Sequence, residues 1–329
     1  MSLLTVHDLA RSFSGRSSLA QMLSLKKSPR IRALNGVSLT IARGETLAVL
    51  GESGCGKSTL ARTLVRLIDL DSRQISFDGE DVTTLRGAAL RRCNRRVQMV
   101  FQDPYGSLNP RMTVGQILTE ALFVHDMVPA SERAARVAGL LDLVRLPHAA
   151  ADRLPHEFSG GQRQRIAIAR ALSIEPELLI ADEIVSALDV SVQAQILNLL
   201  LDLQQRLSLA ILFVSHDLRV VRHLAHRVAI MYLGCVVEQG QADAVFDNPR
   251  HPYTKALLRA APSMEPPLPG SPRIRRSAAL SGELPSPLAI PAGCPFHPRC
   301  PQAMAVCRTE IPRIHMADDK HLATCHLLD

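Results

Sequence analysis

The sequence contains no tryptophan, and aromatic residues make up only 3% of its 329 residues, so aliphatic side chains have to fill its core. No run of about twenty uncharged apolar residues occurs, which excludes a membrane-spanning helix. The opening stretch MSLLTVHDLARSF has a short apolar start without a small-residue cleavage site, so no secretory signal is expected. These absences predict a cytoplasmic chain whose seven cysteines are reduced thiols or metal ligands rather than disulfides.

The length and the charge leave several classes of protein open. Apolar residues make up 47% of the chain, which is enough for one large domain with an appendage or for two domains. The net charge of +7 suits anionic partners such as nucleotide phosphates, nucleic acid or an anionic membrane surface. A soluble surface with a modest excess of arginine accounts for the same charge.

Strand-like and helix-like segments alternate along most of the chain. Residues 1–50 have the pattern of short strands, residues 111–175 are mostly helical, and strands and helices then alternate to about residue 240. This order predicts an α/β fold with a parallel sheet covered by helices. After residue 260 the chain becomes rich in proline, glycine and serine, which predicts a largely irregular tail.

The stretch GESGCGKST (residues 51–59) lies between a predicted strand, TLAVL, and a predicted helix, LARTLVRLI. It fits the phosphate-loop pattern G-x-x-x-x-G-K-[ST], and its fixed positions are Gly51, Gly56, Lys57 and Ser58. The glycines let successive N–H groups turn toward phosphate oxygens, and the following helix presents its positive end. Lys57 supplies a charge for the outer phosphates, and Ser58 supplies a hydroxyl for Mg²⁺. The stretch therefore predicts a nucleotide site.

An acidic pair follows the buried strand in LLIADE. Asp182 comes at the tip of this strand, where its carboxylate can hold Mg²⁺ through water. Glu183 follows directly and can orient or deprotonate an attacking water. An acidic strand end is common on its own, but together with a phosphate loop it indicates a nucleotide hydrolase.

A second glycine-led helix start occurs further along the chain, in FSGGQRQR. Ser159 can cap a helix there, and its hydroxyl can also bond a phosphate oxygen. Gly160 and Gly161 remove side chains that would block a close approach, and the helix from Gln162 onward points its positive end at the same place. This pattern predicts a second anion site, which need not serve the chain's own nucleotide.

The FSGGQ stretch resembles the LSGGQ-type signature of the nucleotide-binding subunits of ABC ATPases. In that family two subunits pack head to tail, so that the phosphate loop of one and the signature of the other enclose a shared ATP. The resemblance implies that Gln102 in VFQDP contacts Mg²⁺ and the transport partner, and that His216 in FVSHD contacts the γ-phosphate. Phe13 would stack on adenine, although a lone phenylalanine at a strand end is more often part of a core.

The resemblance thereby assigns roles to three groups of residues. The catalytic residues would be Glu183, His216 and Gln102, and the Mg²⁺ ligands Ser58, Gln102 and Asp182. The residues that bind ATP would be Phe13, Gly51, Glu52, Ser53, Gly54, Cys55, Gly56, Lys57, Ser58, Thr59, Ser159, Gly160, Gly161, Gln162 and Asp189, the last of these in a D-loop-like SALD.

More narrowly, the chain resembles the ATP-binding subunits of dipeptide and oligopeptide permeases over nearly its whole length. The stretches that carry this likeness are VFQDPYGSLNPRMTVGQIL, SALDVSVQAQILNLL, NPRHPYTKALL and SGELPSPL…GCPFHPRC. The likeness implies a P-loop NTPase core of the ABC ATPase type over residues 1–260, with a helical subdomain at about 104–175. It also implies a Cys-containing C-terminal extension over 261–329.

This family implies a function and a set of partners. The chain would be a peripheral subunit on the cytoplasmic face of the cell membrane that hydrolyses ATP to power peptide import. Its partners would be a second, related but different ATPase subunit, two membrane-spanning permease subunits and, indirectly, an extracytoplasmic solute-binding protein, with no nucleic acid. Importers of nickel or glutathione use similar subunits, so the substrate stays open at this point.

One position departs from the family pattern. Proline usually follows the ADE triplet, whereas this chain has Ile184 there. Proline would fix the backbone next to Glu183 and remove an N–H, so we expect Glu183 to be held less rigidly and turnover to survive at a lower rate. A variant that traps its nucleotide is the alternative.

The tail contains Cys294, Cys300, Cys307 and Cys325, with the spacings C-x5-C, C-x6-C and C-x17-C. Structural zinc sites usually contain tight C-x2–4-C pairs, which this tail lacks. The permease resemblance implies a [4Fe–4S] cluster on these four thiols. Zinc and the absence of any metal are the alternatives.

Two features favour rival functions. The stretch LRGAALRRCNRRVQ is rich in arginine, which suits nucleic acid, but it lacks interleaved aromatics and fits a solvated helix face near the membrane better. A soluble ABC ATPase of translation or DNA repair is the main rival. Such chains usually carry two cassettes or a long coiled-coil insertion, whereas this one has a single cassette without heptads.

Overall fold

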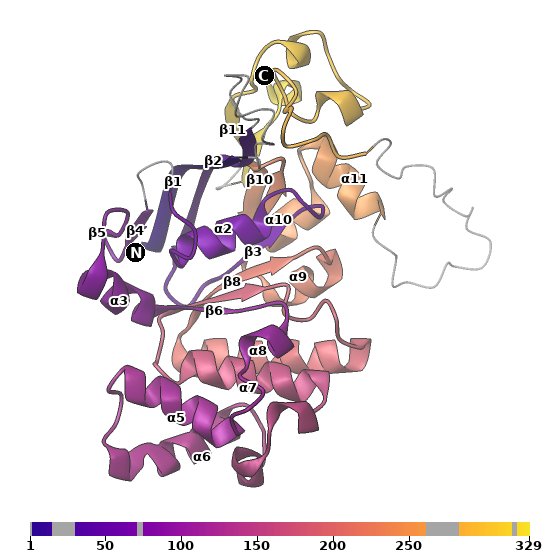
Figure 1. Ribbon diagram of the computed structural model, residues 1–329. Helices are drawn as coiled ribbons and strands as arrows, with labels where there is room; N and C mark the ends of the chain where they lie inside the picture. The colour runs from indigo at the N-terminus through magenta and orange to yellow at the C-terminus, as the bar shows by residue number, and fades with distance from the viewer. Residues whose placement is uncertain (1, 15–29, 71–74, 261–282, 318–320) are drawn as a thin grey trace, which may run out of the picture.

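The computed structural model describes residues 2–14, 30–70, 75–260, 283–317 and 321–329. Figure 1 shows a helical tier at the bottom, a tier of strands in the middle and the C-terminal residues at the top. Among the described residues, no helix is both long and apolar enough to cross a membrane.

The main sheet is largely parallel, as the alternation of strands and helices predicts. Its strands are, in spatial order, β11 (Ile314–Ala317), β12 (His321–Thr324), β10 (Cys235–Gln241), β9 (Arg227–Tyr232), β3 (Thr46–Leu50), β8 (Ala210–Ser215), β7 (Leu178–Asp182) and β6 (Val97–Val100). The strands from β9 to β6 run parallel, and β3, β7 and β8 are completely buried. Parallel strands end at one common edge, so the segments that follow β3, β6, β7 and β8 meet there.

A smaller antiparallel sheet lies beside the main one. Its order is β2 (Arg30–Ala42), β1 (Ser2–Ser14), β4 (Ile75–Phe77) and β5 (Glu80–Asp81). The strands expected in the first fifty residues are therefore present as long strands, and β1 ends at the cavity described below. The short strands β4 and β5 have no clear pattern in the sequence and were not predicted.

Helices cover the main sheet and fill the segment between β6 and β7. In that segment lie α4 (Pro104–Ser107), α5 (Val114–Val124), α6 (Arg133–Leu143) and α7 (Gly160–Leu172), which form the lower tier of Figure 1. The remaining helices are α2 (Lys57–Leu64), α3 (Gly87–Arg96), α8 (Val190–Leu207), α9 (Leu218–Leu224), α10 (Ala242–Asp247) and α11 (Pro252–Ala260). The helices expected over residues 111–175 are thus present.

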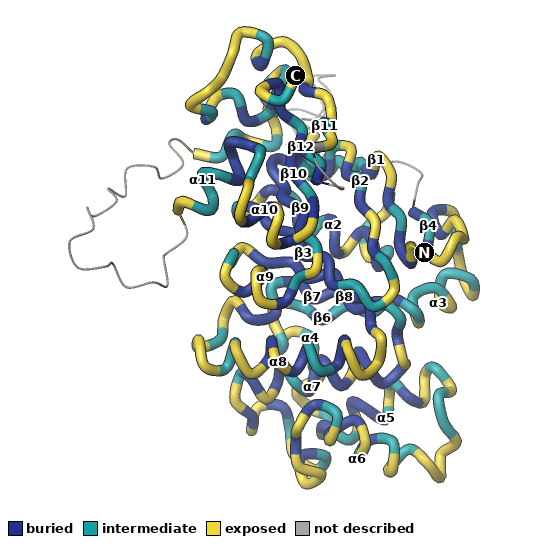
Figure 2. Tube along the Cα trace, turned by 180° about the vertical axis from the view of Figure 1, so that it is seen from behind, coloured by how far each residue is buried: buried dark blue, intermediate teal, exposed yellow. Residues whose placement is uncertain are grey.

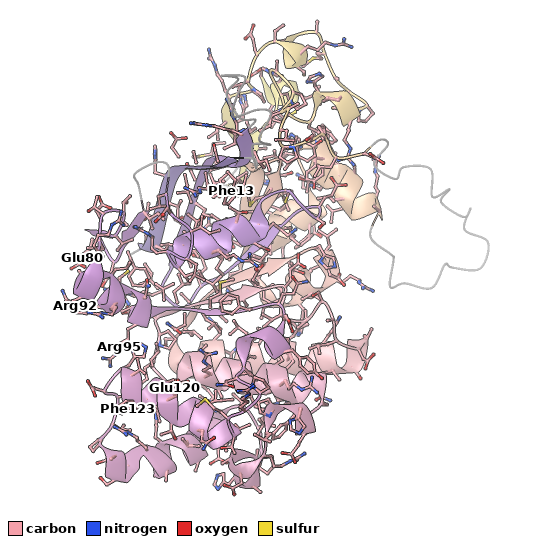
Figure 3. All side chains as sticks on the ribbon, in the orientation of Figure 1. Phe13, Glu80, Arg92, Arg95, Glu120 and Phe123 are labelled. Atoms are coloured by element: carbon pink, nitrogen blue, oxygen red, sulfur yellow. The ribbon has the colours of Figure 1, made fainter. Side chains whose placement is uncertain are left out.

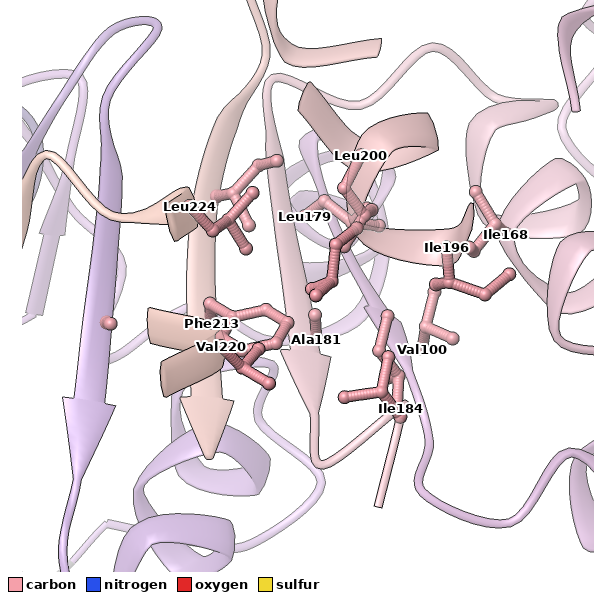
Figure 4. Close-up of a cluster of buried hydrophobic side chains, with 14 of the residues drawn as sticks. Val100, Ile168, Leu179, Ala181, Ile184, Ile196, Leu200, Phe213, Val220 and Leu224 are labelled. Carbon is pink, nitrogen blue, oxygen red and sulfur yellow. The ribbon is translucent and has the colours of Figure 1, made fainter. Parts of the chain in front are cut away.

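The main sheet separates two hydrophobic cores. Along β3, Leu47 and Val49 point into a core shared with β1, β2 and α2, whereas Ala48 and Leu50 point into the core shared with the helical tier. This alternation follows the two-residue period of a strand. Figure 2 shows the central strands as buried and the outer turns of the helical tier as exposed, and Figure 4 shows part of the second core. The core is mainly aliphatic, as the composition requires.

The C-terminal residues are joined to the main sheet. β11 and β12 form a hairpin, and β12 pairs with β10 through Glu238↔Ala323 and Gln239↔Leu322. Between residue 283 and this hairpin the chain is irregular apart from two 3₁₀ turns, His297–Arg299 and Val306–Arg308. The tail is therefore less irregular than its composition predicts, because backbone pairing with β10 orders its last strands.

Candidate active site

A cavity of about 410 Å³ lies at the edge where the parallel strands end. Its walls bring together residues that are far apart in the sequence. Those predicted above are Phe13, Ser53, Gly54, Gly56, Lys57, Ser58, Thr59, Gln102 and Glu183, and those not predicted are Ile31, Ala33 and Pro287. One cavity thus joins the phosphate loop, the end of β1 and the segments after β6 and β7.

The phosphate loop leaves the start of α2 open to this cavity. Gly56 is the N-cap residue, and no side chain caps the helix. It has a φ of +109°, and a Cβ at this position would lie 2.3 Å from the Ala33 carbonyl oxygen, so only glycine fits. The first N–H groups of α2 therefore remain available to an anion.

Lys57 is buried, and its ammonium lies at the floor of the cavity. Its Nζ donates to the carbonyl oxygens of Gly51 (2.9 Å) and Glu52 (3.1 Å) and lies 3.7 Å from the Glu183 carboxylate. Its charge is thus placed beside the open start of α2, where the sequence pattern predicts the outer phosphates.

Ser58 and Asp182 form the inner end of the site. The Ser58 hydroxyl donates to Asp182 Oδ1 over 2.9 Å, and the Asp182 side chain is almost completely buried. Burial raises the pKa of the Asp182 carboxyl, with only partial relief from the Ser58 hydrogen bond. A hydroxyl and a carboxylate are the oxygen ligands that Mg²⁺ prefers, and a divalent cation would offset the desolvation of Asp182. These two residues therefore fit the metal predicted for them.

Glu183 is the meeting point of the other polar groups. Its carboxylate accepts a hydrogen bond from Gln102 Nε2 (3.3 Å) and lies 3.6 Å from His216 Nδ1, in addition to its contact with Lys57. Its backbone is in the left-handed region, with φ +49°, which costs about 1–2 kcal/mol for a residue with a Cβ. Strain of this kind persists only where the surroundings hold it, and here the Glu183 N–H donates to the Val214 carbonyl at 3.0 Å.

Ile184 anchors the backbone that follows Glu183. Its side chain is 2% exposed and packs into the core beside Val100 and Ala181 (Figure 4). Where the family pattern has proline, this chain thus buries a large aliphatic side chain. The looser hold on Glu183 and the lower turnover expected without proline stay predictions.

Phe13 lies at the wall of the cavity and not in a core. It is partly exposed, and the Arg11 guanidinium lies 5.1 Å from the centre of its ring. Figure 3 labels it near the end of β1. A partly exposed ring on a cavity wall is consistent with stacking on a base, which remains a prediction.

The second glycine-led helix start lies outside this cavity, and so does Asp189. Ser159 caps α7 as predicted: its hydroxyl accepts from the Gln162 N–H, and the Gln162 side chain accepts from the Ser159 N–H. A Cβ on Gly161 would lie 2.3 Å from Val192 Cγ1, so this glycine is required for α7 to pack against α8. The structure thus does not bring the two glycine-led sites together within one chain.

The four tail cysteines gather in the C-terminal extension. Burial raises the pKa of the Cys294 thiol to about 11, and the charges of Cys300, Cys307 and Cys325 contribute to the same shift. The Cys294 N–H also donates to the Cys307 carbonyl oxygen at 2.9 Å. All seven cysteines of the chain are free thiols. Within the described residues, however, no three cysteine, histidine or acidic side chains are close enough together to hold a metal ion.

No role at the site was expected for Pro287, Tyr253 and Arg299, although each lies in a stretch that resembles the permease subunits. Pro287 lines the cavity, and the Tyr253 hydroxyl accepts a hydrogen bond from the Glu52 N–H at 3.0 Å. Arg299 forms an ion pair with Glu52. No local pattern predicts such contacts, since the partners come from distant parts of the chain.

Comparison with known proteins gives two family matches and many relatives. Residues 34–186 match the family described as ABC transporter, and residues 237–307 match the C-terminal region of oligopeptide/dipeptide transporters. The probable peptide ABC transporter ATP-binding protein y4tS of Sinorhizobium fredii is 54% identical over 91% of this chain and 83% of its own length. The oligopeptide transport ATP-binding protein AppF of Bacillus subtilis is 48% identical over 99% of this chain and 97% of its own length.

Solved structures share the fold of the larger part of the chain. CbiO1 of Clostridium perfringens, part of the ABC transporter complex cbiONQ, has a TM-score of 0.63 and 30% identity over 75% of this chain and 91% of its own. The ATP-binding cassette MJ0796, solved as a dimer bound to ADP and Pi in a post-hydrolysis state, has a TM-score of 0.63 and 26% identity over 73% of this chain and 98% of its own.

Proposed function

Because the chain belongs to the ATP-binding subunits of the dipeptide and oligopeptide permease family of ABC transporters, we propose that it hydrolyses ATP to power the import of di- or oligopeptides. The relatives at 46–54% identity are named for peptide, oligopeptide or di/tripeptide transport or import. Nothing in these names favours nickel, glutathione or nucleic acid as the substrate or partner.

The observation that carries the chemistry is the position of Glu183 at the phosphate-loop cavity. Its carboxylate lies between Lys57, Gln102 and His216, at 3.3–3.7 Å from each. A carboxylate held in this way can orient a water for in-line attack on a γ-phosphate, and Lys57 can balance the developing charge. His216 is largely exposed and can reach the same phosphate from the solvent side. When bound, Mg²⁺ would be held by Ser58 and Asp182 and would neutralise phosphate charge.

Two chains are needed for a complete site. The signature residues Ser159–Gln162 do not line the chain's own cavity, while the Ser159 hydroxyl stays free to donate a hydrogen bond even as it caps α7. A second cassette, packed head to tail, would bring its own signature to this cavity. The dimeric form of the MJ0796 cassette supports such an arrangement. We infer a related but different subunit as the partner, in line with the family.

A groove in the helical tier offers a place for the membrane-spanning partner. A cavity of about 320 Å³ lies between β6, α5 and α7, and its lining includes Glu120, Val124 and Arg170. Elsewhere on the helical tier Phe123 is 59% exposed and Tyr105 is 63% exposed, and Figure 3 shows Glu120 and Phe123 on α5. A groove, and exposed aromatic side chains on the same helical tier, suit contact with a short amphipathic helix. Docking there would place the chain at the cytoplasmic face of the membrane.

The four tail thiols are, in our proposal, the ligands of a [4Fe–4S] cluster. Cys294, Cys307 and Cys325 are buried, and the Cys294 N–H donates to the Cys307 carbonyl oxygen, which supports this; the four thiols would have to come closer together to share a cluster. Purification without oxygen, followed by iron and sulfide assays and an absorption spectrum, tests it. Zinc alone, or no metal, would overturn the proposal. A Cys93→Ser variant changes a cysteine outside the tail, so it should keep the iron content of the parent chain.

Reconstitution tests the main proposal. The chain, a second cassette subunit, two permease subunits and a solute-binding protein would be assembled in liposomes, and ATP hydrolysis and uptake measured with and without peptide. Peptide-stimulated hydrolysis with peptide uptake is the expected result. Stimulation by nickel or glutathione alone would replace the peptide assignment, and hydrolysis that depends on nucleic acid would overturn the transport role.

A further inference from the structure

The C-terminal extension touches the phosphate loop through one arginine. Arg299 Nη1 donates to Glu52 Oε2 over 2.6 Å, and Nη2 donates to Glu52 Oε1 over 3.0 Å. The Arg299 side chain is 4% exposed, and that of Glu52 is 27% exposed. This is a two-point contact between a planar guanidinium and a carboxylate, which fixes orientation as well as distance.

The surroundings of Arg299 are unusual for this chain, which has few aromatic residues. The rings of Tyr232, Tyr253 and Phe296 lie 4.7–5.4 Å from one another, and the Arg299 guanidinium lies 5.9 Å from the Tyr232 ring. Two of the three tyrosines of the chain thus lie around the contact between Arg299 and Glu52. Tyr253 holds the main chain of Glu52 while Arg299 holds its side chain, so Glu52 is fixed at both ends.

Glu52 in turn connects to the residue expected to bind phosphate. The carbonyl oxygens of Gly51 and Glu52 accept hydrogen bonds from Lys57 Nζ. A shift of Glu52 would therefore move the carbonyls that position the Lys57 ammonium. Arg299, Glu52 and Lys57 are therefore linked by a continuous series of hydrogen bonds that runs from the extension to the floor of the cavity.

On the other side, Arg299 is tied to the tail cysteines. It ends a 3₁₀ turn in which the Arg299 N–H donates to Phe296 O and the Cys300 N–H donates to His297 O. The Cys294 N–H donates to Cys307 O at 2.9 Å, which fastens the start of this segment to the next one. The guanidinium is therefore placed by the backbone that runs from Cys294 to Cys300.

We propose that Arg299 is a positioning residue for the nucleotide: through Glu52 it holds the phosphate loop in its binding shape, so that the Cys-containing extension sets the affinity of the site for ATP. This inference rests on the proposed role of the phosphate loop. It assigns the extension a task in ATP binding, in addition to any metal that its thiols hold.

Substitutions of Arg299 in the full-length chain test the proposal. Arg299→Gln removes the two-point contact with Glu52, and the dissociation constant for ATP should rise about tenfold. The KM of the assembled complex for ATP should rise by a similar factor, whereas kcat should change less. Arg299→Lys keeps the charge but not the two-point geometry and should rescue part of the affinity. Arg308→Gln, at an exposed arginine of the same extension, is the matched control and should bind ATP like the parent chain.

A second variant separates positioning from folding. Glu52→Gln removes the other half of the pair, and the double variant Glu52→Gln/Arg299→Gln should bind ATP no more weakly than either single variant, because both act through one contact. Wild-type affinity in Arg299→Gln, or losses that multiply in the double variant, would overturn the inference. If Arg299→Gln only lowers the melting temperature while the folded protein binds ATP normally, the residue is merely structural. Failure of the parent chain to bind ATP would instead overturn the proposed function.

Discussion

The chain has two glycine-led helix starts, at α2 and at α7, and their glycines serve different ends. At α2 the glycine Gly56 is forced by the backbone: its φ is +109° and a Cβ would strike the Ala33 carbonyl. At α7 the backbone is ordinary, and Gly161 is forced by the packing of Val192 against it. The first helix start has no side-chain cap, whereas the second is closed by Ser159 and Gln162.

The two helix starts also differ in their place relative to the cavity. The start of α2 has no side-chain cap and opens into the cavity, with Lys57 and Glu183 of the same chain beside it. At the start of α7 the Ser159 hydroxyl accepts a hydrogen bond from the Gln162 N–H, and residues 159–162 do not line the cavity. The two motifs are therefore alike in sequence but differ in their capping and in their place relative to the cavity.

The largest expected effect is at the first site. Glu183→Gln keeps the shape and the hydrogen bond from Gln102 but removes the negative charge, so steady-state ATP hydrolysis by the complex should fall about 10³-fold. The dissociation constant for ATP should stay within a few fold, because Lys57 and the start of α2 are untouched. Glu132→Gln, at an exposed glutamate of the helical tier, is the control. Turnover at the parental rate would remove Glu183 from its assigned role.

A smaller effect is expected at the second site, with a different signature. Ser159→Asn keeps an N-cap side chain of equal quality but enlarges the group that faces the partner's nucleotide. Hydrolysis by the two-cassette complex should fall about tenfold or more, whereas ATP binding by the single chain should not change. A weakened affinity in the single chain would show that the signature serves its own cavity, and the distinction between the two helix starts would be lost.

Local patterns explain how much of the site could be predicted. The phosphate loop, the acidic pair and the capped start of α7 are each encoded within about ten residues. The ends of parallel strands bring the phosphate loop and the acidic pair to one edge, whereas the start of α7 lies outside their cavity. Gln102 and His216 follow β6 and β8, so their convergence on Glu183 comes from the same topology.

The parts of the fold and of the site that the sequence does not predict depend on contacts between residues that are far apart in the chain. Glu52 and Arg299 are 247 positions apart, and nothing around either residue indicates the other. The β11–β12 hairpin is ordered by β10, the short strand β4 by β1 and β5 by β4, because backbone pairing requires no side-chain pattern. The packing reason for Gly161 likewise lies in Val192, on a different helix.

That packing can be tested by adding one methyl group. Gly161→Ala places a Cβ 2.3 Å from Val192 Cγ1, and a β-branched side chain in a helix has little freedom to turn away, so unfolding by denaturant should show a loss of about 2 kcal/mol. Val192→Ala in the same chain should restore most of it. Gly160→Ala is the matched control, since its Cβ meets only the flexible Leu188 side chain at 3.2 Å. Equal losses at both glycines would point to backbone conformation instead of packing.

A buried histidine precedes a third helix, α11, and makes the stability of this helix start depend on pH. His251 precedes the helix, is completely buried, and accepts a hydrogen bond on Nδ1 from the Tyr253 N–H. Burial, with a contribution from Lys255, lowers the pKa of His251 to about 3. The neutral ring is therefore the cap, and protonation would remove the acceptor and leave a buried charge.

The smallest expected effect follows from this pKa. The unfolded chain takes up a proton at His251 below about pH 6.5 while the folded chain does not, so the contribution to stability is complete above that pH and declines as the pH falls toward 3. Between about pH 7 and about pH 5.5 the free energy of unfolding should drop by about 1 kcal/mol through this residue. His251→Asn keeps an acceptor for the Tyr253 N–H without a titrating ring, so its stability should depend less on pH by that amount. His223→Asn, at an exposed histidine of α9, should leave the dependence as it is.

Since Tyr253 also holds the Glu52 N–H, hydrogen exchange at low pH should rise at the phosphate loop before it rises at the start of α7. An unchanged pH dependence in His251→Asn, or equal exchange at the two helix starts, would contradict the argument.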